Sequence, residues 1–176
     1  MTSFTVSRQI SIDAGHRVMT HGSKCRHLHG HRYTIEATCL ADHLQDVGEQ
    51  SDMVFDFGFL KEAMAAEIDA PCDHGFLAHV EDFELLDMFC PETADAIEWI
   101  RAIRQAVRQD GHHLTTETRM ETKLYVLDVN PTAEQLSRHW FNRLKPVVTA
   151  RSGGVAKLQE IIVWEPPHCR AAYREP

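Results

Sequence analysis

Residues 29–39 read HGHRYTIEATC, and residues 4–12 read FTVSRQISI. In both stretches apolar and polar side chains alternate, with Arg8 as the exception in the earlier one. A two-residue period is typical of a strand with one buried face, because successive side chains point to opposite sides of a sheet. The two stretches are separated by a loop, so they predict an antiparallel pair of strands.

Two amphipathic helices are expected further along the sequence. The first follows the turn at residues 56–58 and ends before Pro71. Its apolar face consists of Phe57, Leu60, Met64 and Ile68. The second begins at Asn130, which can act as its N-cap, and Pro131 suits the first helical position. Its apolar face consists of Leu136, Trp140, Leu144 and Val147.

Short apolar runs at residues 158–164 and 169–173 predict two more strands. The order β, β, α, α, β, β is that of an α+β domain, interrupted by a segment at residues 78–122. The acidic first half of this segment predicts one helix, and residues 111–121 are expected to form a polar loop. The segment is either a functional lid or a solvated decoration. The second is favoured because long loops often have no chemical role, and we expect the segment to be removable.

Composition limits the class of protein. The 176 residues, 43% of them hydrophobic, suffice for one packed domain over residues 1–176. The formal net charge of −8 argues against a general nucleic-acid binder. No stretch approaches the roughly 20 continuous apolar residues of a membrane span, and the first residues lack the pattern of a signal peptide. We therefore expect a cytoplasmic protein that binds neither nucleic acid nor membrane.

Twelve histidines are the unusual feature of the composition. His29 and His31 leave the same face of their predicted strand, on the side of Tyr33. His16 continues the inward-facing row of the first strand if that strand extends so far. Chance alone gives about one His-x-His pair at this composition, so the addition of His16 is what favours a metal site. Three neutral imidazoles are typical of catalytic zinc, which keeps a fourth position open.

Cys25 lies four residues before His29, between two cationic side chains that favour a reactive thiolate. It could instead act as a fourth zinc ligand that closes the site, and spacing leaves both roles open. The other cysteines are expected to be small packed residues, and an odd total argues against a disulfide framework as the basis of the fold. They are Cys39, Cys72, Cys90 and Cys169.

A series of motifs follows in order along the sequence: Ala14-Gly15-His16, Cys25-x-x-x-His29-Gly30-His31, Met53-Val54-Phe55-Asp56-Phe57, Asp73-His74, Pro131-Thr132-Ala133-Glu134 and Glu165. Together these motifs resemble the 6-pyruvoyl-tetrahydropterin synthase family. The three-residue spacer after Cys25 is similar to that of the bacterial 6-carboxy-tetrahydropterin synthases of queuosine biosynthesis. Gly15 departs from the family, where a second alanine is usual, and the segment 78–122 is extra relative to the short bacterial members.

The resemblance implies a tunnelling fold: a four-stranded antiparallel sheet with two helices on one face, assembled into a barrel as a trimer or a pair of trimers. It implies Zn²⁺ on His16, His29 and His31. It also implies catalytic roles for Cys25, Asp73 and His74. Glu165 would anchor the guanidine-like edge of a pterin, with help from Thr132, although a threonine there is equally well placed to cap a helix.

The substrate implied by the resemblance is 7,8-dihydroneopterin triphosphate. Residues 14–35 contain four cations and no acid, so this stretch is expected to receive the phosphates. Loss of acetaldehyde and triphosphate would give 6-carboxy-tetrahydropterin. The alternatives are a 6-pyruvoyl-tetrahydropterin synthase and a family member that binds pterin or zinc without catalysis.

Overall fold

The computed structural model describes residues 3–165 and 168–175. Within them, seven strands form one sheet in the order β4-β5-β3-β1-β2-β6-β7. The strands are β1 (Phe4–His16), β2 (His29–Ala41), β3 (Gly75–His79), β4 (His112–Thr115), β5 (Lys123–Leu127), β6 (Lys157–Glu165) and β7 (Cys169–Arg174). The expected antiparallel sheet is present as β1, β2, β6 and β7. The other strands extend it beyond β1, where β3 pairs with both β1 and β5 in parallel.

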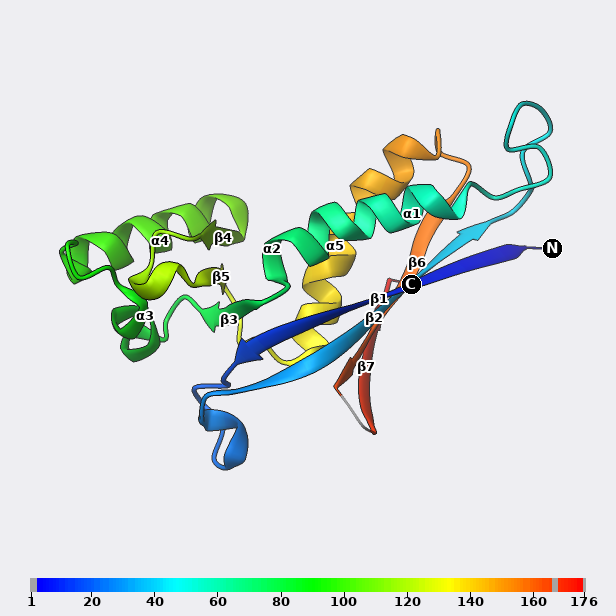
Figure 1. Cartoon of the computed structure of the whole chain (residues 1–176). Coiled ribbons are helices and arrows are strands. Elements are labelled where there is room, and N and C mark those ends of the chain that lie inside the picture. The colour runs from blue at the N-terminus through cyan, green and yellow to red at the C-terminus, as the bar shows by residue number, and fades with distance from the viewer. Residues whose placement is uncertain (1–2, 166–167, 176) are drawn as a thin grey trace.

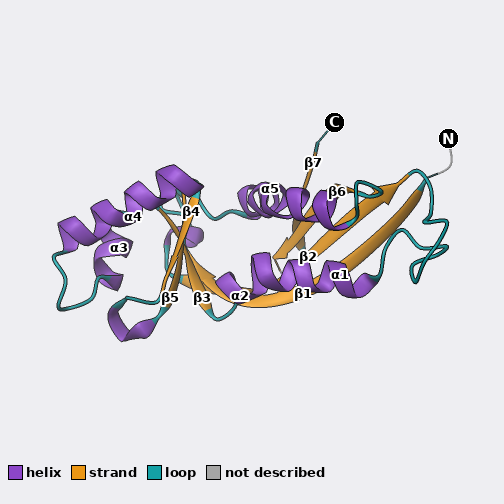
Figure 2. Ribbon diagram, turned by 90° about the horizontal axis from the view of Figure 1, so that it is seen from above, coloured by secondary structure: helices purple, strands orange, loops and turns teal. Residues whose placement is uncertain are grey.

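The helices form two groups at different places along this sheet (Figures 1 and 2). The first group is α1 (Phe57–Met64), α2 (Ala70–Cys72) and α5 (Ala133–Arg151), and the second is α3 (Phe83–Phe89) and α4 (Ala96–Asp110). Figure 2 shows α1 and α5 side by side over the long strands, with α3 and α4 at one end of the molecule. Two short 3-10 turns lie at Lys24–Arg26 and Arg119–Glu121. No helix among the described residues has the length and apolar character that crossing a membrane requires.

Two helix boundaries differ from the sequence expectation. The first helix does not stop before Pro71, because a π-helical turn at Ala65–Asp69 leads into α2, which accommodates the proline in its first turn. Such a turn shifts the hydrogen-bonding pattern of a helix, and a proline lacks the N–H that a regular pattern would use. The second helix is capped by Thr132, not Asn130, since the Thr132 hydroxyl accepts a hydrogen bond from Gln135 N at 3.3 Å. Pro131 therefore precedes the helix.

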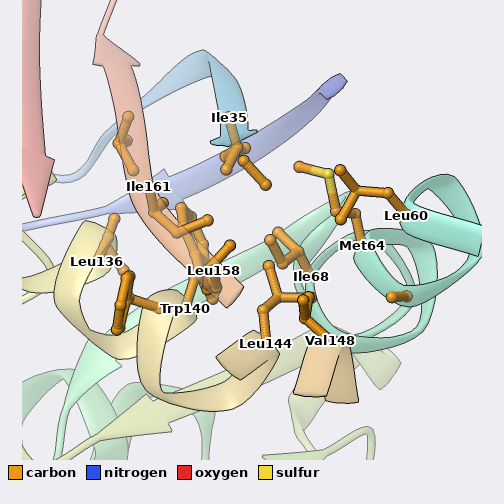
Figure 3. Packing of buried hydrophobic residues seen from close by; sticks show 14 of the residues in the cluster. Ile35, Leu60, Met64, Ile68, Leu136, Trp140, Leu144, Val148, Leu158 and Ile161 are labelled. Atoms are coloured by element: carbon orange, nitrogen blue, oxygen red, sulfur yellow. The ribbon is translucent and has the colours of Figure 1, made fainter. Parts of the chain in front are cut away.

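The main core lies between the long strands and the helices α1 and α5 (Figure 3). Tyr33 and Ile35 of β2 are completely buried, which confirms the inward face deduced from the alternation. The helices contribute one stripe each, with two differences from the expected faces: Val148 is buried where Val147 was expected, and Phe57 is 54% exposed. The labelled side chains of Figure 3 converge from both layers: Ile35, Leu60, Met64, Ile68, Leu136, Trp140, Leu144, Val148, Leu158 and Ile161.

Residues 78–122 form a packed unit with a core of its own. They contain two helices where one was expected, and residues 111–121 include β4 and a 3-10 turn, so the expectation of a loop is wrong. Gly111, with φ 75°, ends α4 in the left-handed region and lets the backbone turn directly into β4. Strand β4 has only four residues, which is too short for a two-residue alternation to be recognised in the sequence. The second core consists of Ala78, Val80, Leu85, Leu86, Phe89, Ile103, Val107, Leu124 and Val126.

The two cores meet across β5. Leu124 and Val126 face the second core, while Tyr125 and Leu127 on the opposite face belong to the main core. Deletion of residues 78–122 would therefore expose one face of this strand to water. Such exposure would destabilise the fold, which is at odds with the expectation that residues 78–122 can be removed.

Candidate metal centre and adjoining cavity

Three histidines converge at the end of the β1–β2 pair. The register places His16 opposite His29 and Ala14 opposite His31, so the three imidazoles share the inward face. Their candidate ligand atoms all lie within 4.8 Å of one another. The structure thus brings together the three residues expected from strand parity.

The hydrogen bonds of the rings leave one nitrogen of each of two histidines for a metal. His16 Nδ1 donates to the Pro131 carbonyl oxygen at 2.7 Å, and His29 Nδ1 donates to the His27 carbonyl oxygen at 2.8 Å. His16 is 2% exposed, and its Nε2 is buried without a hydrogen-bond partner among the described residues. Burial lowers the pKa of His16 to about 4, so the ring is neutral at pH 7. A buried, neutral and unpartnered imidazole nitrogen fits a metal ligand.

Two glycines permit the close backbone approach at this centre. A Cβ on Gly30 would lie 3.0 Å from the Ala14 carbonyl oxygen of the neighbouring strand. A Cβ on Gly15 would lie 2.6 Å from the ring of Phe76, which reaches over β1 from β3. Glycine at position 15 therefore leaves room for Phe76 of β3, the strand that leads into residues 78–122.

A cavity of about 330 Å³ adjoins the histidines. Cys25, Thr132 and Glu165 line it together with His16 and His29. Cys25 comes from the 3-10 turn, Thr132 from the start of α5 and Glu165 from the end of β6. These three residues were expected to act on one substrate. The structure places them in one cavity, although they come from separate parts of the sequence.

Cys169 is a cavity residue that the sequence reasoning missed. Cys169 lies exposed at the start of β7, and the expectation that it is a packed residue is wrong, because this strand is at the edge of the sheet. Cys39, Cys72 and Cys90 are buried as expected.

Tyr33 lies beside the three histidines, with its ring centroid 5.5 Å from that of His31. Its pKa is raised by burial and then by the nearby Glu165 carboxylate. Strand parity placed Tyr33 on the face of the histidines, but its closeness to Glu165 joins distant parts of the sequence and cannot be found from spacing.

Asp73 and His74 form a pair, but they do not line this cavity. His74 Nδ1 donates to Asp73 Oδ2 at 2.6 Å, and Asp13 N donates to Asp73 Oδ1 at 2.8 Å. Burial acts to raise the pKa of Asp73, and these two hydrogen bonds outweigh it and lower the pKa. The His74 side chain is 78% exposed, and its backbone has the left-handed φ of 54°. The pair therefore places an ionised carboxylate beside an imidazole that points outward at the surface.

The basic stretch at residues 14–35 is partly neutralised in the fold. Arg17 forms an ion pair with Asp82, and Arg32 forms one with Asp13 at 2.8 Å. Lys24 and Arg26 are exposed and lie beside Cys25. Of the four cations in this stretch, these two form no ion pair within the described residues and are free to contact an anionic group.

Comparison with solved structures defines the class of protein. An uncharacterized protein from Wolinella succinogenes superposes with a TM-score of 0.72 at 18% identity over 100% of both chains. A 6-pyruvoyl tetrahydropterin synthase from Plasmodium vivax gives a TM-score of 0.62 at 14% identity over 99% of each protein. These likenesses show the fold, which is the tunnelling fold.

Sequence comparison then places the protein in a family. The family model described as 6-pyruvoyl tetrahydropterin synthase matches residues 5–176. A 6-carboxy-5,6,7,8-tetrahydropterin synthase from Rickettsia bellii is 32% identical over 80% of this sequence and 79% of its own length. One from Aquifex aeolicus is 29% identical over 97% of each. The chain belongs to the 6-pyruvoyl tetrahydropterin synthase family.

Proposed function

We propose that this protein is a zinc-dependent lyase that converts 7,8-dihydroneopterin triphosphate to 6-carboxy-5,6,7,8-tetrahydropterin, with release of acetaldehyde and triphosphate. The names of its relatives support the product. The observation that carries the proposal is that a cysteine and a glutamate line the same cavity, beside a cluster of three histidines. Such a reaction needs an acid–base group, a carboxylate that accepts hydrogen bonds from the pterin edge, and a set of metal-binding residues.

Each residue has a role that follows from its chemistry. His16, His29 and His31 would hold Zn²⁺, which supplies Lewis-acid polarisation of substrate oxygens when bound. Glu165 would accept two parallel hydrogen bonds from the guanidine-like edge of the pterin. Cys25, lining the same cavity, would act as the base that removes a proton from a hydroxylated carbon of the substrate. Thr132 helps chiefly by capping α5, which fixes the end of the helix that borders the cavity.

Asp73 and His74 act in this reaction if the protein assembles into a ring. On one side β1 pairs with β3 only at Ala14–His16, so residues 4–12 present an open strand edge, and β7 presents another. Open edges of this length favour pairing between copies, and we propose a trimer or a pair of trimers. In that ring Asp73 and His74 of the partner subunit would complete the cavity that contains Cys25. His74 would then act as partner acid or base, oriented by Asp73.

Release of triphosphate tests this proposal. Protein loaded with zinc should liberate triphosphate from 7,8-dihydroneopterin triphosphate, and protein stripped by a chelator should not until zinc is restored. Binding of the pterin without any release would favour the non-catalytic alternative. Release that is equally fast in the stripped protein would contradict the role of zinc.

A further inference from the structure

The loop between β1 and β2, residues 17–28, carries Cys25 and has little apolar anchorage. Among its residues only Arg17, Val18 and Cys25 are partly buried and the others are exposed, and the 3-10 turn at Lys24–Arg26 contains no buried residue. A loop that buries few apolar groups needs another means of holding a reactive side chain in place. Its fixed points are therefore polar contacts.

The strongest of these contacts joins the loop to the inserted segment. Arg17 Nε donates to Asp82 Oδ2 at 2.6 Å, and Arg17 Nη2 donates to Asp82 Oδ1. Asp82 is 2% exposed, and its carboxylate also caps α3 by accepting from Leu85 N at 3.3 Å. A buried, bidentate pair has a defined geometry, so the position of α3 fixes the position of Arg17.

One further hydrogen bond carries this restraint to the cysteine. Val18, the residue after Arg17, donates its backbone N–H to the Cys25 carbonyl oxygen at 2.8 Å. The restraint thus passes from Asp82 to Arg17, and from Val18 to Cys25. These loop residues are also the three that are least exposed. The exposed Glu84 lies 3.5 Å from Arg17 and offers only a weak surface contact by comparison.

We propose that Asp82 is a positioning residue for Cys25, and that the inserted segment holds the cysteine loop in its working geometry. The role rests on the proposed function of Cys25 as the base. Proton transfer requires the base within hydrogen-bond reach of the substrate, and a displacement of about 1 Å can lower the rate by roughly a hundredfold. Release of the Arg17 contact would let the loop, and Cys25 with it, move.

The test uses Asp82→Asn in the zinc-loaded protein. Asparagine preserves the cap of α3 and the size of the side chain but removes the charge that fixes Arg17. Asp95→Asn is the matched control, because Asp95 caps α4 in the same segment by accepting from Glu98 N at 3.0 Å. The first measurement is the rate of iodoacetamide alkylation of Cys25 by peptide mass spectrometry, with Cys169 in the same cavity as internal reference. The second is the separate determination of kcat and KM.

We expect Asp82→Asn to change the Cys25 alkylation rate relative to Cys169, and to lower kcat by about tenfold or more while KM and zinc content stay near wild type. Asp95→Asn should behave as wild type. Unchanged alkylation and unchanged kcat in Asp82→Asn would overturn the proposal. A wild-type protein without turnover would contradict the proposed function. Alkylation needs no substrate, so its rate would still test whether Asp82 positions Cys25.

Arg17→Lys provides a second variant if Asp82→Asn does not fold. Lysine keeps the positive charge, but a single ammonium cannot reproduce the bidentate contact with Asp82. The same change in Cys25 alkylation is expected here. A folded Arg17→Lys protein with wild-type alkylation and kcat would overturn the proposal as well.

Discussion

At the residue scale, Cys25 is the group whose role is most open to direct test. It lines the cavity with Glu165 and His16, and it comes from a loop that is separate from the strands of the histidines. If Cys25 is the base, Cys25→Ala should keep zinc and pterin binding, because the histidines and Glu165 are unchanged. Turnover should fall by roughly a hundredfold or more, as is typical for a lost acid–base group. Zinc content and turnover of this variant are the measurements.

The same variant separates the two roles that spacing along the sequence left open. If Cys25 is a fourth zinc ligand, Cys25→Ala will lose metal together with activity. Cys39→Ala is a useful control, because it removes a thiol that is buried in the main core and does not line the cavity. A Cys25→Ala protein with near-normal turnover would exclude the residue from the mechanism.

Residue patterns predicted that three histidines would cluster, but not where Asp73 and His74 lie relative to the cavity. His16, His29 and His31 could be placed on one face because strand parity is a local property. Asp73 and His74 are adjacent in sequence, but their position outside the cavity of Cys25 depends on the packing of distant segments and could not be read from the sequence. The Arg17–Asp82 pair spans 65 positions, and no local period connects the two residues.

At the element scale, the junction of α5 with β4 and β5 contains a partly buried histidine. His139 Nε2 accepts a hydrogen bond from the Tyr125 hydroxyl at 2.8 Å. Burial, followed by the charges of His112 and Arg143, lowers the pKa of His139 from 6.5 to about 3. Below pH 6.5 the unfolded protein therefore binds a proton that the folded protein does not bind. The stabilising effect is complete above pH 6.5 and is lost as the pH falls toward 3.

This junction predicts a steep loss of stability in mild acid. Between pH 6 and 4 the contribution of His139 to the free energy of unfolding should fall by at most about 1.4 kcal/mol per pH unit. His139→Gln keeps an acceptor for Tyr125 but does not titrate, so its stability should depend less on pH. Denaturant unfolding at several pH values checks this, with the exposed His43→Gln as control. Equal pH dependence in His139→Gln and wild type would contradict it.

Elements with a clear period were predicted from the sequence, and the short ones were not. The alternation in β1 and β2 and the stripes of α1 and α5 reflect burial against one core, so each is visible in a local window. Strands β3, β4 and β5 have only four or five residues each. Their pairing depends on contacts with distant segments, and β5 is buried on both faces, which removes the alternation.

At the scale of the whole molecule, the position of Asp73 and His74 outside the cavity of their own protomer predicts shared sites. Cys25→Ala and His74→Ala should each be inactive alone. Hybrids formed by dissociating and reassembling a mixture should regain activity, because some sites then combine an intact Cys25 with His74 of the partner subunit. Light scattering on the hybrids verifies assembly as a trimer or hexamer. Assembled hybrids that stay inactive, or a monomer at micromolar concentration, would contradict the shared site.

The identity of the product tests the central claim most directly. One incubation of the zinc-loaded wild-type protein with 7,8-dihydroneopterin triphosphate, analysed by mass spectrometry, distinguishes the outcomes. The proposed function predicts 6-carboxy-5,6,7,8-tetrahydropterin and acetaldehyde in equal amounts. Accumulation of the 6-pyruvoyl compound as sole product would assign the protein to the other branch of its family, and an unconsumed substrate would contradict the synthase activity itself.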